Sequence, residues 1–526
     1  MGAIATSFLR GLCLCSLVSL LGACATLPTD YAKPESFAVR DTAGTKLATQ
    51  LDPITAQHPE KSGFRALVSG TDALVARAGL IKAAERTLDV QYYIWRTDVS
   101  GRVMVGLLLE AADRGVRVRI LLDDLDTAGK DFSLAKIDRH PNIEIRLYNP
   151  FANRSARSAE FLTDLRRVNR RMHNKSLTAD NRATIVGGRN IGNEYFGGKS
   201  ATQFADFDVL AIGPIVDEVS NAFDVYWNSE WVFPVSAFTK DAEISEEELQ
   251  AARDELRRYL QAQSSSPYAL ALQASELVQK ESFAALQYVW GEASLLYDAP
   301  SKVVADEVTA ATHIGPNLGK VFAAAKRELI VISPYFVPGD ELVEFFGELT
   351  ARGTRVRILT NSLAATDVGV VHAGYMRYRV DLLKNGVELY EFKPTEPGEG
   401  ETQDTSWRGS SKASLHAKTF AVDRKLVFVG SFNLDPRSFA LNTEMGVLFE
   451  SAALAGQIGE SFDRDLIRAA YRVRFKEHDG SRASEELEWV TEEDGARIAY
   501  DKEPETSWWQ RFSAGFLSIF VPESML

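Results

Sequence analysis

The chain contains one long internal repeat. The letters ADRGVRVRIL and TARGTRVRIL, which begin at Ala112 and Thr350, align without a gap about 240 positions apart. Around both, a hydrophobic run, a helical pattern, a glycine and a second hydrophobic run follow one another, at 88–122 and at 329–359. Strands that alternate with helices of roughly 10–15 residues indicate α/β layers. The repeat is far longer than a solenoid unit, so the sequence predicts a duplicated α/β domain.

The repeat also sets the predicted organisation of the 526 residues, which are too many for one ordinary domain. The charged run at 240–262 predicts a solvated helix between the halves. We expect a signal segment at 1–24, a polar tether at 25–62, a first half at 63–262, a connecting segment at 263–300, a second half at 301–475, and a C-terminal extension at 476–526.

The N-terminus predicts an export signal. Arg10 is followed by a short apolar stretch that ends in Leu21-Gly-Ala-Cys24. This ending resembles the lipobox of bacterial lipoproteins, which implies cleavage before Cys24 and lipidation of its thiol; an ordinary signal cut at a small residue is the alternative. No Asp follows the cysteine, which by the same resemblance favours the outer membrane. We therefore expect a lipid-anchored protein of the bacterial envelope that faces the periplasm.

Charge and cysteine content exclude several functions. The formal net charge is −13, whereas proteins that hold nucleic acid by its backbone usually carry a basic surface, so no nucleic-acid partner is expected. The three cysteines all lie at or before Cys24. A mature chain thus has no intrachain disulfide, cysteine zinc site or thiol nucleophile.

Two copies of one polar motif carry the chemistry. Each consists of a histidine, a lysine two positions later and an aspartate five positions after the lysine, followed at the same offset by Gly-[Gly/Ser]-x-Asn. One such motif is expected about 0.02 times by chance in this chain, so two at equivalent places of a repeat are a strong signal. The residues are His173, Lys175, Asp180, Gly188 and Asn190 in the first copy, and His416, Lys418, Asp423, Ser431 and Asn433 in the second.

The motif suits displacement at a phosphodiester. In a strand, residues i and i+2 face the same side, so each histidine points with its lysine. If the two halves face each other, one imidazole can attack phosphorus while the other protonates the leaving oxygen. The lysines would stabilise the charge on the phosphate, and Asn190, Asn433 and the Ser431 hydroxyl would bind its oxygens. Because the lysines replace a metal electrostatically, no metal or other cofactor is expected.

Each histidine needs a carboxylate to orient it. Asp206 and Glu444 lie at matching places, 33 and 28 residues after the histidine of their own half, and Asp208 competes with Asp206. The motif residues Asp180 and Asp423 are expected to support the local fold rather than to touch substrate.

These motifs identify the chain as similar to the phospholipase D superfamily over about Ala66 to Arg472. The resemblance implies two α/β/α sandwiches related by a pseudo-twofold axis around one active site, with His173 as the nucleophile and His416 as the general acid. The letters RMHNKS, GGRNIGNEYF, SPYFVPGDELV and SLHAKTFAVD resemble bacterial cardiolipin synthases, especially the C type.

That resemblance implies transfer of a phosphatidyl group onto phosphatidylglycerol, with phosphatidylethanolamine as a candidate second phospholipid. A hydrolytic phospholipase D shares every catalytic residue and remains open, as does, with less support, a nuclease. Tyr93, Tyr335 and His372 are candidates for lining the cleft, with core packing as the alternative. The aromatic C-terminal segment from Trp508 is expected either in the membrane interface or packed on the domain.

Overall fold

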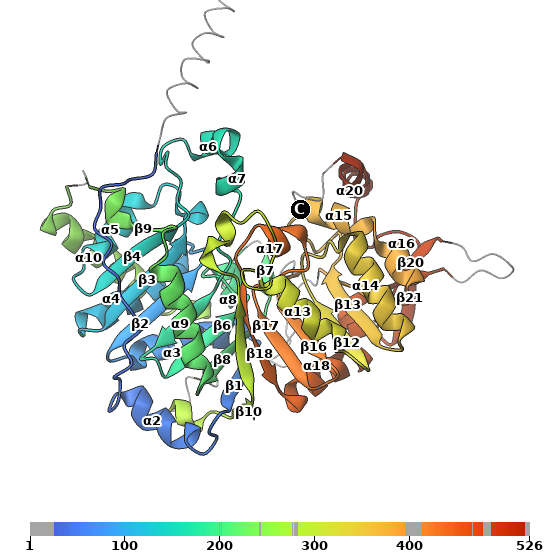
Figure 1. The fold of residues 1–526 in the computed structure, drawn as a ribbon, viewed down its shortest axis with the longest axis horizontal. Coiled ribbons are helices and arrows are strands. Elements are labelled where there is room, and N and C mark those ends of the chain that lie inside the picture. Colours follow the sequence, from blue (N-terminus) through green and yellow to red (C-terminus); the bar gives the residue numbers. More distant parts are fainter. Residues whose placement is uncertain are drawn as a thin grey trace, which may run out of the picture.

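A computed structural model describes residues 26–520, except for 199, 201, 241–242, 276, 278–281, 395–412, 465 and 477–484. Two large mixed β-sheets stand next to each other, and helices flank both (Figure 1). The predicted duplicated α/β fold is therefore confirmed. Cys24 and the signal segment lie outside the described residues.

The first sheet has nine described strands in the order β10-β1-β8-β6-β5-β2-β3-β4-β9, with β2, β3 and β4 parallel. These central strands are rich in Val, Ile and Leu and are buried on both faces, as parallel strands between helices usually are. Their bounds are Ser62–Leu67 (β1), Thr87–Tyr92 (β2), Arg117–Asp123 (β3), Ile143–Tyr148 (β4), Ser176–Ala179 (β5), Ala183–Gly187 (β6), Asp208–Ile212 (β8), Val232–Pro234 (β9) and Val289–Gly291 (β10).

The second sheet has ten described strands in the order β11-β18-β17-β16-β12-β13-β14-β19-β20-β21. Its first eight positions repeat the order that runs from β1 to β9 in the first sheet, which is the duplication that the repeat predicts. The bounds are Ala293–Tyr297 (β11), Glu328–Ile332 (β12), Arg355–Asn361 (β13), Glu388–Phe392 (β14), Lys418–Val422 (β16), Leu426–Gly430 (β17), Met445–Glu450 (β18), Ala470–Phe475 (β19), Leu487–Glu493 (β20) and Ala496–Tyr500 (β21).

The domain boundaries differ from the predicted ones. Strand β10 completes the first sheet and β11 begins the second, so the chain passes between the halves at Glu292, inside the expected connecting segment 263–300. Strands β20 and β21 extend the second sheet into the expected C-terminal extension. Strands as short as β10, which has three residues, carry no readable alternation of apolar and polar residues.

Helices flank both sheets, and where the halves meet β6 and β8 of the first sheet lie against β17 and β18 of the second (Figure 1). One continuous core contains residues of both halves, and the rings of Phe64 and Phe449 stack within it at 4.0 Å between centroids. The main helices are α2 (Lys46–Thr55), α3 (Gly70–Ala83), α4 (Val99–Asp113), α5 (Asp131–Asp138), α9 (Ile215–Trp227), α10 (Glu246–Gln263), α13 (Ile314–Ala323), α14 (Gly339–Ala351), α15 (Gly369–Met376), α16 (Arg379–Lys384), α18 (Ala452–Arg464) and α20 (Trp508–Phe520).

The segment expected as a tether, 25–62, is attached to the first half for most of its length. Lys33 Nζ donates to the carbonyl of Ser229 at 2.7 Å, and the amide of Ala38 donates to Asp224 at 2.8 Å. Helix α2 follows, capped by the Thr45 side chain. Prolines and polar residues suggested a linker, but these long-range contacts, which leave no periodic pattern in the sequence, hold the segment in place.

Candidate active site

The two motif segments lie where the halves meet. His173 to Lys175 come just before β5, and Lys418 is the first residue of β16. The prediction that both histidines lie within strands was therefore wrong, because each leaves its own sheet to contact the opposite half.

These contacts with the opposite half are made by the backbone. A two-stranded parallel sheet pairs β7 (Gln203–Ala205) with β15 (Ala413–Leu415), and the amide of His416 donates to the carbonyl of Ala205 at 2.7 Å. At the equivalent place, the amide of His173 donates to the carbonyl of Thr443 at 2.8 Å. Each histidine therefore lies beside the residue that precedes the other half's candidate carboxylate.

The carboxylates consequently pair across the halves. Asp206 contacts Nδ1 of His416 at 2.6 Å, and Glu444 contacts Nδ1 of His173 at 3.1 Å. This corrects the expected pairing of each carboxylate with the histidine of its own half. With Nδ1 held by a carboxylate, Nε2 is the nitrogen of each ring left to react with phosphorus.

Asp208, the alternative to Asp206, has another partner. Its side chain lies 2.9 Å from the guanidinium of Arg77 and 3.3 Å from that of Arg189, all three fully buried. Residues i and i+2 of an extended segment face the same side, so the sequence alone does not show which of the two aspartates orients a histidine.

Burial sets the protonation of the histidines. It lowers the pKa of His173 to about 4, although Glu444 raises it. Burial also lowers the pKa of His416, as does Lys418, against the opposing effect of Asp206. Burial tends to raise the pKa of Asp206, but His416 and Lys418 hold it below its usual value. At neutral pH the site therefore holds neutral imidazoles beside ionised carboxylates.

The two lysines are buried in the same site. Burial lowers the pKa of Lys175 and of Lys418 to about 8, and Glu444 and Asp206 limit the decrease. Lys418 further lowers the pKa of Lys175, which places the two ammonium groups within electrostatic reach of each other. Each lysine also donates to the carbonyl of the histidine two residues before it. Glu444 and Asp206 partly balance these two buried cations, and a phosphate between the ammonium groups would add a further negative charge.

The predicted phosphate-binding residues are not equivalent. The amide of Asn190 bridges the Ile94 backbone and the Tyr195 hydroxyl, whereas the side-chain oxygen of Asn433 is buried with no hydrogen-bond partner among the described residues. The Ser431 hydroxyl accepts a hydrogen bond from the amide of Met445 at 3.0 Å and donates to its carbonyl at 3.3 Å. The backbone of β18 therefore engages this hydroxyl, and Glu444 accepts from the hydroxyl of Ser438 instead, at 3.0 Å.

The two motif aspartates, Asp180 and Asp423, bind backbone amides. Asp180 accepts hydrogen bonds from the amides of Glu85, Arg86 and Thr87, at 2.7–3.0 Å. Asp423 makes the equivalent bonds to Lys326, Arg327 and Glu328, at 2.7–3.1 Å. Both therefore fasten the strand pair that carries the motif.

Their burial predicts unequal effects on stability. Asp180 is fully buried, whereas the amides that Asp423 binds at Lys326 and Arg327 are exposed and can turn to water. We expect Asp180→Ala to lower the free energy of unfolding by about 3 kcal/mol and Asp423→Ala by about 1 kcal/mol. Urea unfolding followed by tryptophan fluorescence measures both values. Equal losses would contradict the ranking.

Gly188 accounts for one difference between the halves. A Cβ at this position would lie 2.2 Å from Oδ1 of Asp206, so no side chain fits while that carboxylate orients His416. Glu444, one methylene longer, reaches His173 with Ser431 at the matching position. Because the side chain of Asp206 is one methylene shorter than that of Glu444, it must lie closer to the backbone at position 188 to orient its histidine.

We expect Gly188→Ser to reduce kcat by about a hundredfold, the usual effect of moving a catalytic group by about 1 Å. The reverse change, Ser431→Gly, removes a hydroxyl hydrogen bond without a clash and should cost less than about tenfold. Steady-state rates with matched melting curves test both variants. A Gly188→Ser enzyme of normal rate would show that the carboxylate can move without consequence.

Aromatic rings complete the surroundings of both imidazoles. Tyr93 lies 4.1 Å from His173 between ring centroids, and Tyr195 and Phe204 lie 5.3 and 4.9 Å from His416. The sequence analysis named Tyr93 as a candidate for the cleft but not Tyr195 or Phe204. The only feature of the sequence that could have indicated them is that Tyr195 lies shortly after Asn190 and Phe204 shortly before Asp206. Tyr335, whose hydroxyl donates to Asp367, lies near Lys418.

His372 is not part of this site. It is buried in α15, where Nε2 lies 2.9 Å from Arg379 and 3.4 Å from Glu503. It therefore fastens the chain before α20 to the second half, which is the packing alternative considered for it.

A duplicated α/β fold that brings two histidine–lysine pairs together, each imidazole oriented by a carboxylate of the other half, is the architecture of the phospholipase D superfamily. The family model described as "Cardiolipin synthase, PLD-like domain" matches residues 78–227 and 318–466. The chain belongs to this family, and the resemblance seen in the motifs is confirmed.

Individual proteins support the same assignment. Cardiolipin synthase C of Escherichia coli K12 is 43% identical over 489 residues, covering 91% of this chain and all of the relative. Cardiolipin synthase A of Pseudomonas aeruginosa is 26% identical over 82% of this chain and 73% of the relative. The crystal structure of phosphatidylserine synthase from Haemophilus influenzae superimposes with a TM-score of 0.52 at 14% identity, covering 80% of this chain and 91% of that one, and thus shares the fold.

Proposed function

We propose that the protein is a phosphatidyltransferase that makes cardiolipin from phosphatidylglycerol and a second phospholipid, with phosphatidylethanolamine as a candidate. The observation that carries the proposal is the pair of imidazoles, each held at Nδ1 by a carboxylate of the other half, which suits two successive displacements at one phosphorus. The full-length similarity to a protein named cardiolipin synthase C supports the choice of reaction.

In the first displacement, Nε2 of His173 attacks phosphorus and a P–N bond forms while the bond to the leaving alcohol oxygen breaks. Its pKa of about 4 keeps the imidazole neutral and nucleophilic at pH 7. His416 supplies the proton to the leaving oxygen. Burial, Lys418 and Lys175 lower the pKa of His416, and the negative charge of a bound phosphate opposes these effects and so favours its protonated form.

In the second displacement, neutral His416 takes the proton of the incoming alcohol, whose oxygen replaces His173 on phosphorus. Lys175 and Lys418 stabilise the negative charge on the phosphoryl oxygens throughout, and the amides of Asn190 and Asn433 donate to the same oxygens. The incoming alcohol decides the product: the headgroup of phosphatidylglycerol gives cardiolipin, and water gives phosphatidic acid.

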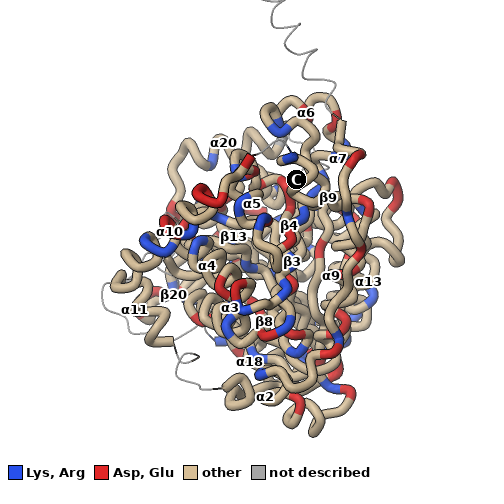
Figure 2. Tube along the Cα trace, turned by 90° about the vertical axis from the view of Figure 1, so that its left-hand side faces the viewer, with Lys and Arg blue, Asp and Glu red and all other residues tan. Residues whose placement is uncertain are grey.

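Purified protein in mixed micelles of phosphatidylglycerol and phosphatidylethanolamine tests this choice. Cardiolipin as the main product, resolved by chromatography and mass spectrometry, is the expected result. Phosphatidic acid without cardiolipin would instead support hydrolysis. A nuclease would cleave oligonucleotides in the same buffer; the net charge of −13, with acidic and basic residues interspersed on the face in Figure 2, argues against it.

We also propose that the protein is lipidated at Cys24 and held at the periplasmic face of the envelope, in the outer membrane. The lipobox supports this address. None of the described helices combines the length and apolarity needed to span a bilayer. Cys24→Ala should move the protein from the membrane fraction to the soluble fraction, and a variant that still incorporates labelled fatty acid would contradict the assignment.

Helix α20 supports an orientation at that membrane. Trp508, Trp509 and Phe512 are 51–69% exposed, while Ala514 of the same helix is buried. On the same upper side in Figure 1, α6 (Arg157–Thr163) lies beside the start of the described chain and leaves Leu162 90% exposed, whereas α20 lies over the second half. Exposed tryptophan and leucine side chains on the side where the chain begins suit the membrane interface.

A further inference from the structure

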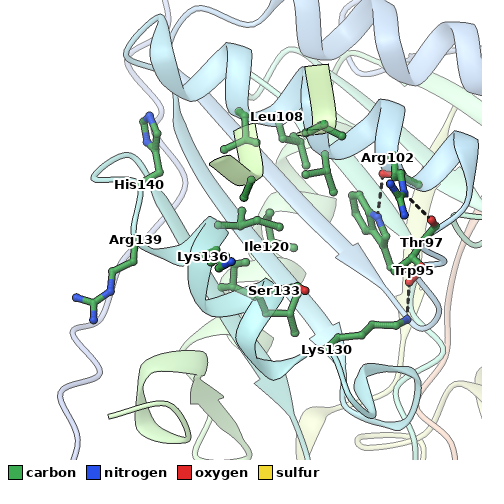
Figure 3. Close-up of a pocket in the computed structure, with 18 of the residues that line it drawn as sticks. Trp95, Thr97, Arg102, Leu108, Ile120, Lys130, Ser133, Lys136, Arg139 and His140 are labelled. Atoms are coloured by element: carbon green, nitrogen blue, oxygen red, sulfur yellow. Dashed lines mark hydrogen bonds between the residues drawn. The ribbon is translucent and has the colours of Figure 1, made fainter. Parts of the chain in front are cut away.

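An apolar groove runs over the first sheet, outside the catalytic pair. It lies between α4 and α5, above β3 and below α10, and its cavity volume is about 650 Å³. Figure 3 shows Leu108 and Ile120 facing its centre, with Trp95 and Lys130 at one end and His140 at the other. The volume falls in the range of about 300–1,000 Å³ that is usual for ligand sites.

The groove exists because α4, α5 and α10 do not close over the sheet. Leu109 on α4, Leu134 and Ile137 on α5, and Leu249 and Leu256 on α10 all line it and remain only half-buried. Helix α10 approaches α4 closely at Gly106, where a Cβ would lie 2.8 Å from Leu260. Because α10 has no fully buried residue, its apolar side faces the groove without filling it.

One end of the groove reaches the catalytic pair. Tyr93 lines the groove and also contacts the ring of His173, 4.1 Å away between centroids. The ammonium of Lys175 lies 5.6 Å from the same tyrosine ring. The ring of Tyr93 therefore lines the groove and also contacts the nucleophile, His173.

The polar groups at both ends already have partners. Lys130 binds Asp126 at 2.7 Å and the carbonyl of Trp95 at 2.8 Å, and Arg102 donates to the carbonyl of Thr97 at 2.9 Å. At the far end, His140 lies 3.0 Å from Asp113. An occupant would consequently bind chiefly by burying apolar surface in the middle, which points to a hydrocarbon chain rather than to a charged or sugar ligand.

We propose that the groove holds one acyl chain of the phospholipid whose phosphorus His173 attacks. This inference rests on the proposed function. From Tyr93 to His140 the groove spans several residues of strand, on the order of 15 Å, and one acyl chain spans half of a bilayer core of roughly 30 Å. Each buried methylene increases affinity roughly fourfold, so a chain in the groove positions the phosphate as well as recognising the lipid.

Tryptophan substitutions that fill the groove test the proposal. We expect Leu134→Trp to lower, by at least tenfold, the ratio of kcat/KM for a long-chain phosphatidylglycerol to that for bis(4-nitrophenyl) phosphate, which has no acyl chain. Leu256→Trp, on the opposite wall and on a helix without buried residues, should lower the same ratio. Phe132→Trp, on the exposed side of α5, is the matched control and should leave the ratio unchanged.

A ratio that stays within twofold of wild type in both groove variants, with unchanged melting temperatures, would overturn the acyl-chain site. An equal change in Phe132→Trp would do the same. Failure of the proposed function is distinguishable, because the wild-type protein would then turn over bis(4-nitrophenyl) phosphate but no phospholipid. A phosphatidylglycerol with a photoreactive group at the end of one chain provides a direct readout: crosslinks should map to residues that line the groove, among them Leu249 and Leu256 of α10, and crosslinks confined to residues outside the groove would contradict the proposal.

Discussion

Replacing His173 with alanine is expected to abolish both turnover and covalent labelling of the protein. The variant lacks the nitrogen that forms the P–N bond, so the loss in kcat should reach at least about 10⁴-fold, as for other nucleophiles that act as part of a unit. Headgroup-labelled and phosphorus-labelled phosphatidylglycerol measure turnover and attachment in the same sample. The label on the wild-type protein should be released by acid, as a phosphoramidate is.

His58→Ala is the matched control for this experiment. His58 stacks on Trp290 at 4.1 Å and takes no part in the catalytic contacts, so its removal should leave rate and labelling near wild type. Turnover that survives in His173→Ala would remove the nucleophile assignment. Labelling that survives there and disappears in His416→Ala would exchange the roles of the two histidines.

The sequence predicted which residues meet, because both motifs occupy the same place in a repeated domain. If two copies of one fold associate around a pseudo-twofold axis, equivalent residues approach each other at the axis. His173 and His416 share one site because both motif segments lie where the halves meet, at equivalent places of the repeat. The support from Asp180 and Asp423 was predictable for a similar reason, since it is local to each motif.

The partner of each histidine could not be predicted in this way. It depends on the register of β7 against β15 and on the bridge between Met172 and Thr443, which join residues more than 200 positions apart. No periodicity in the sequence reports such a register. The same limit applies to the groove: the pattern of α10 predicts a solvated helix, which is correct, but not that its apolar side would cover an open cavity.

The exchange of carboxylates between the halves can be tested by separating the two chemical steps. Glu444→Gln should impair His173, and therefore the formation of the covalent intermediate, whatever the leaving group. Asp206→Asn should impair His416, which formation of the covalent intermediate needs only where the leaving alcohol requires a proton. Loss of such an orienting carboxylate costs roughly 10³–10⁴-fold in kcat in comparable systems.

A substrate with a 4-nitrophenolate leaving group distinguishes the two effects, because that group departs without protonation. With this substrate Asp206→Asn should still form the phosphohistidine at close to the wild-type rate, although its turnover of phosphatidylglycerol is lost. Glu444→Gln should fail with both substrates. Pairing within each half predicts the opposite: Asp206→Asn would then prevent labelling and Glu444→Gln would permit it. Rapid-quench labelling of the two variants therefore decides which carboxylate orients the nucleophile.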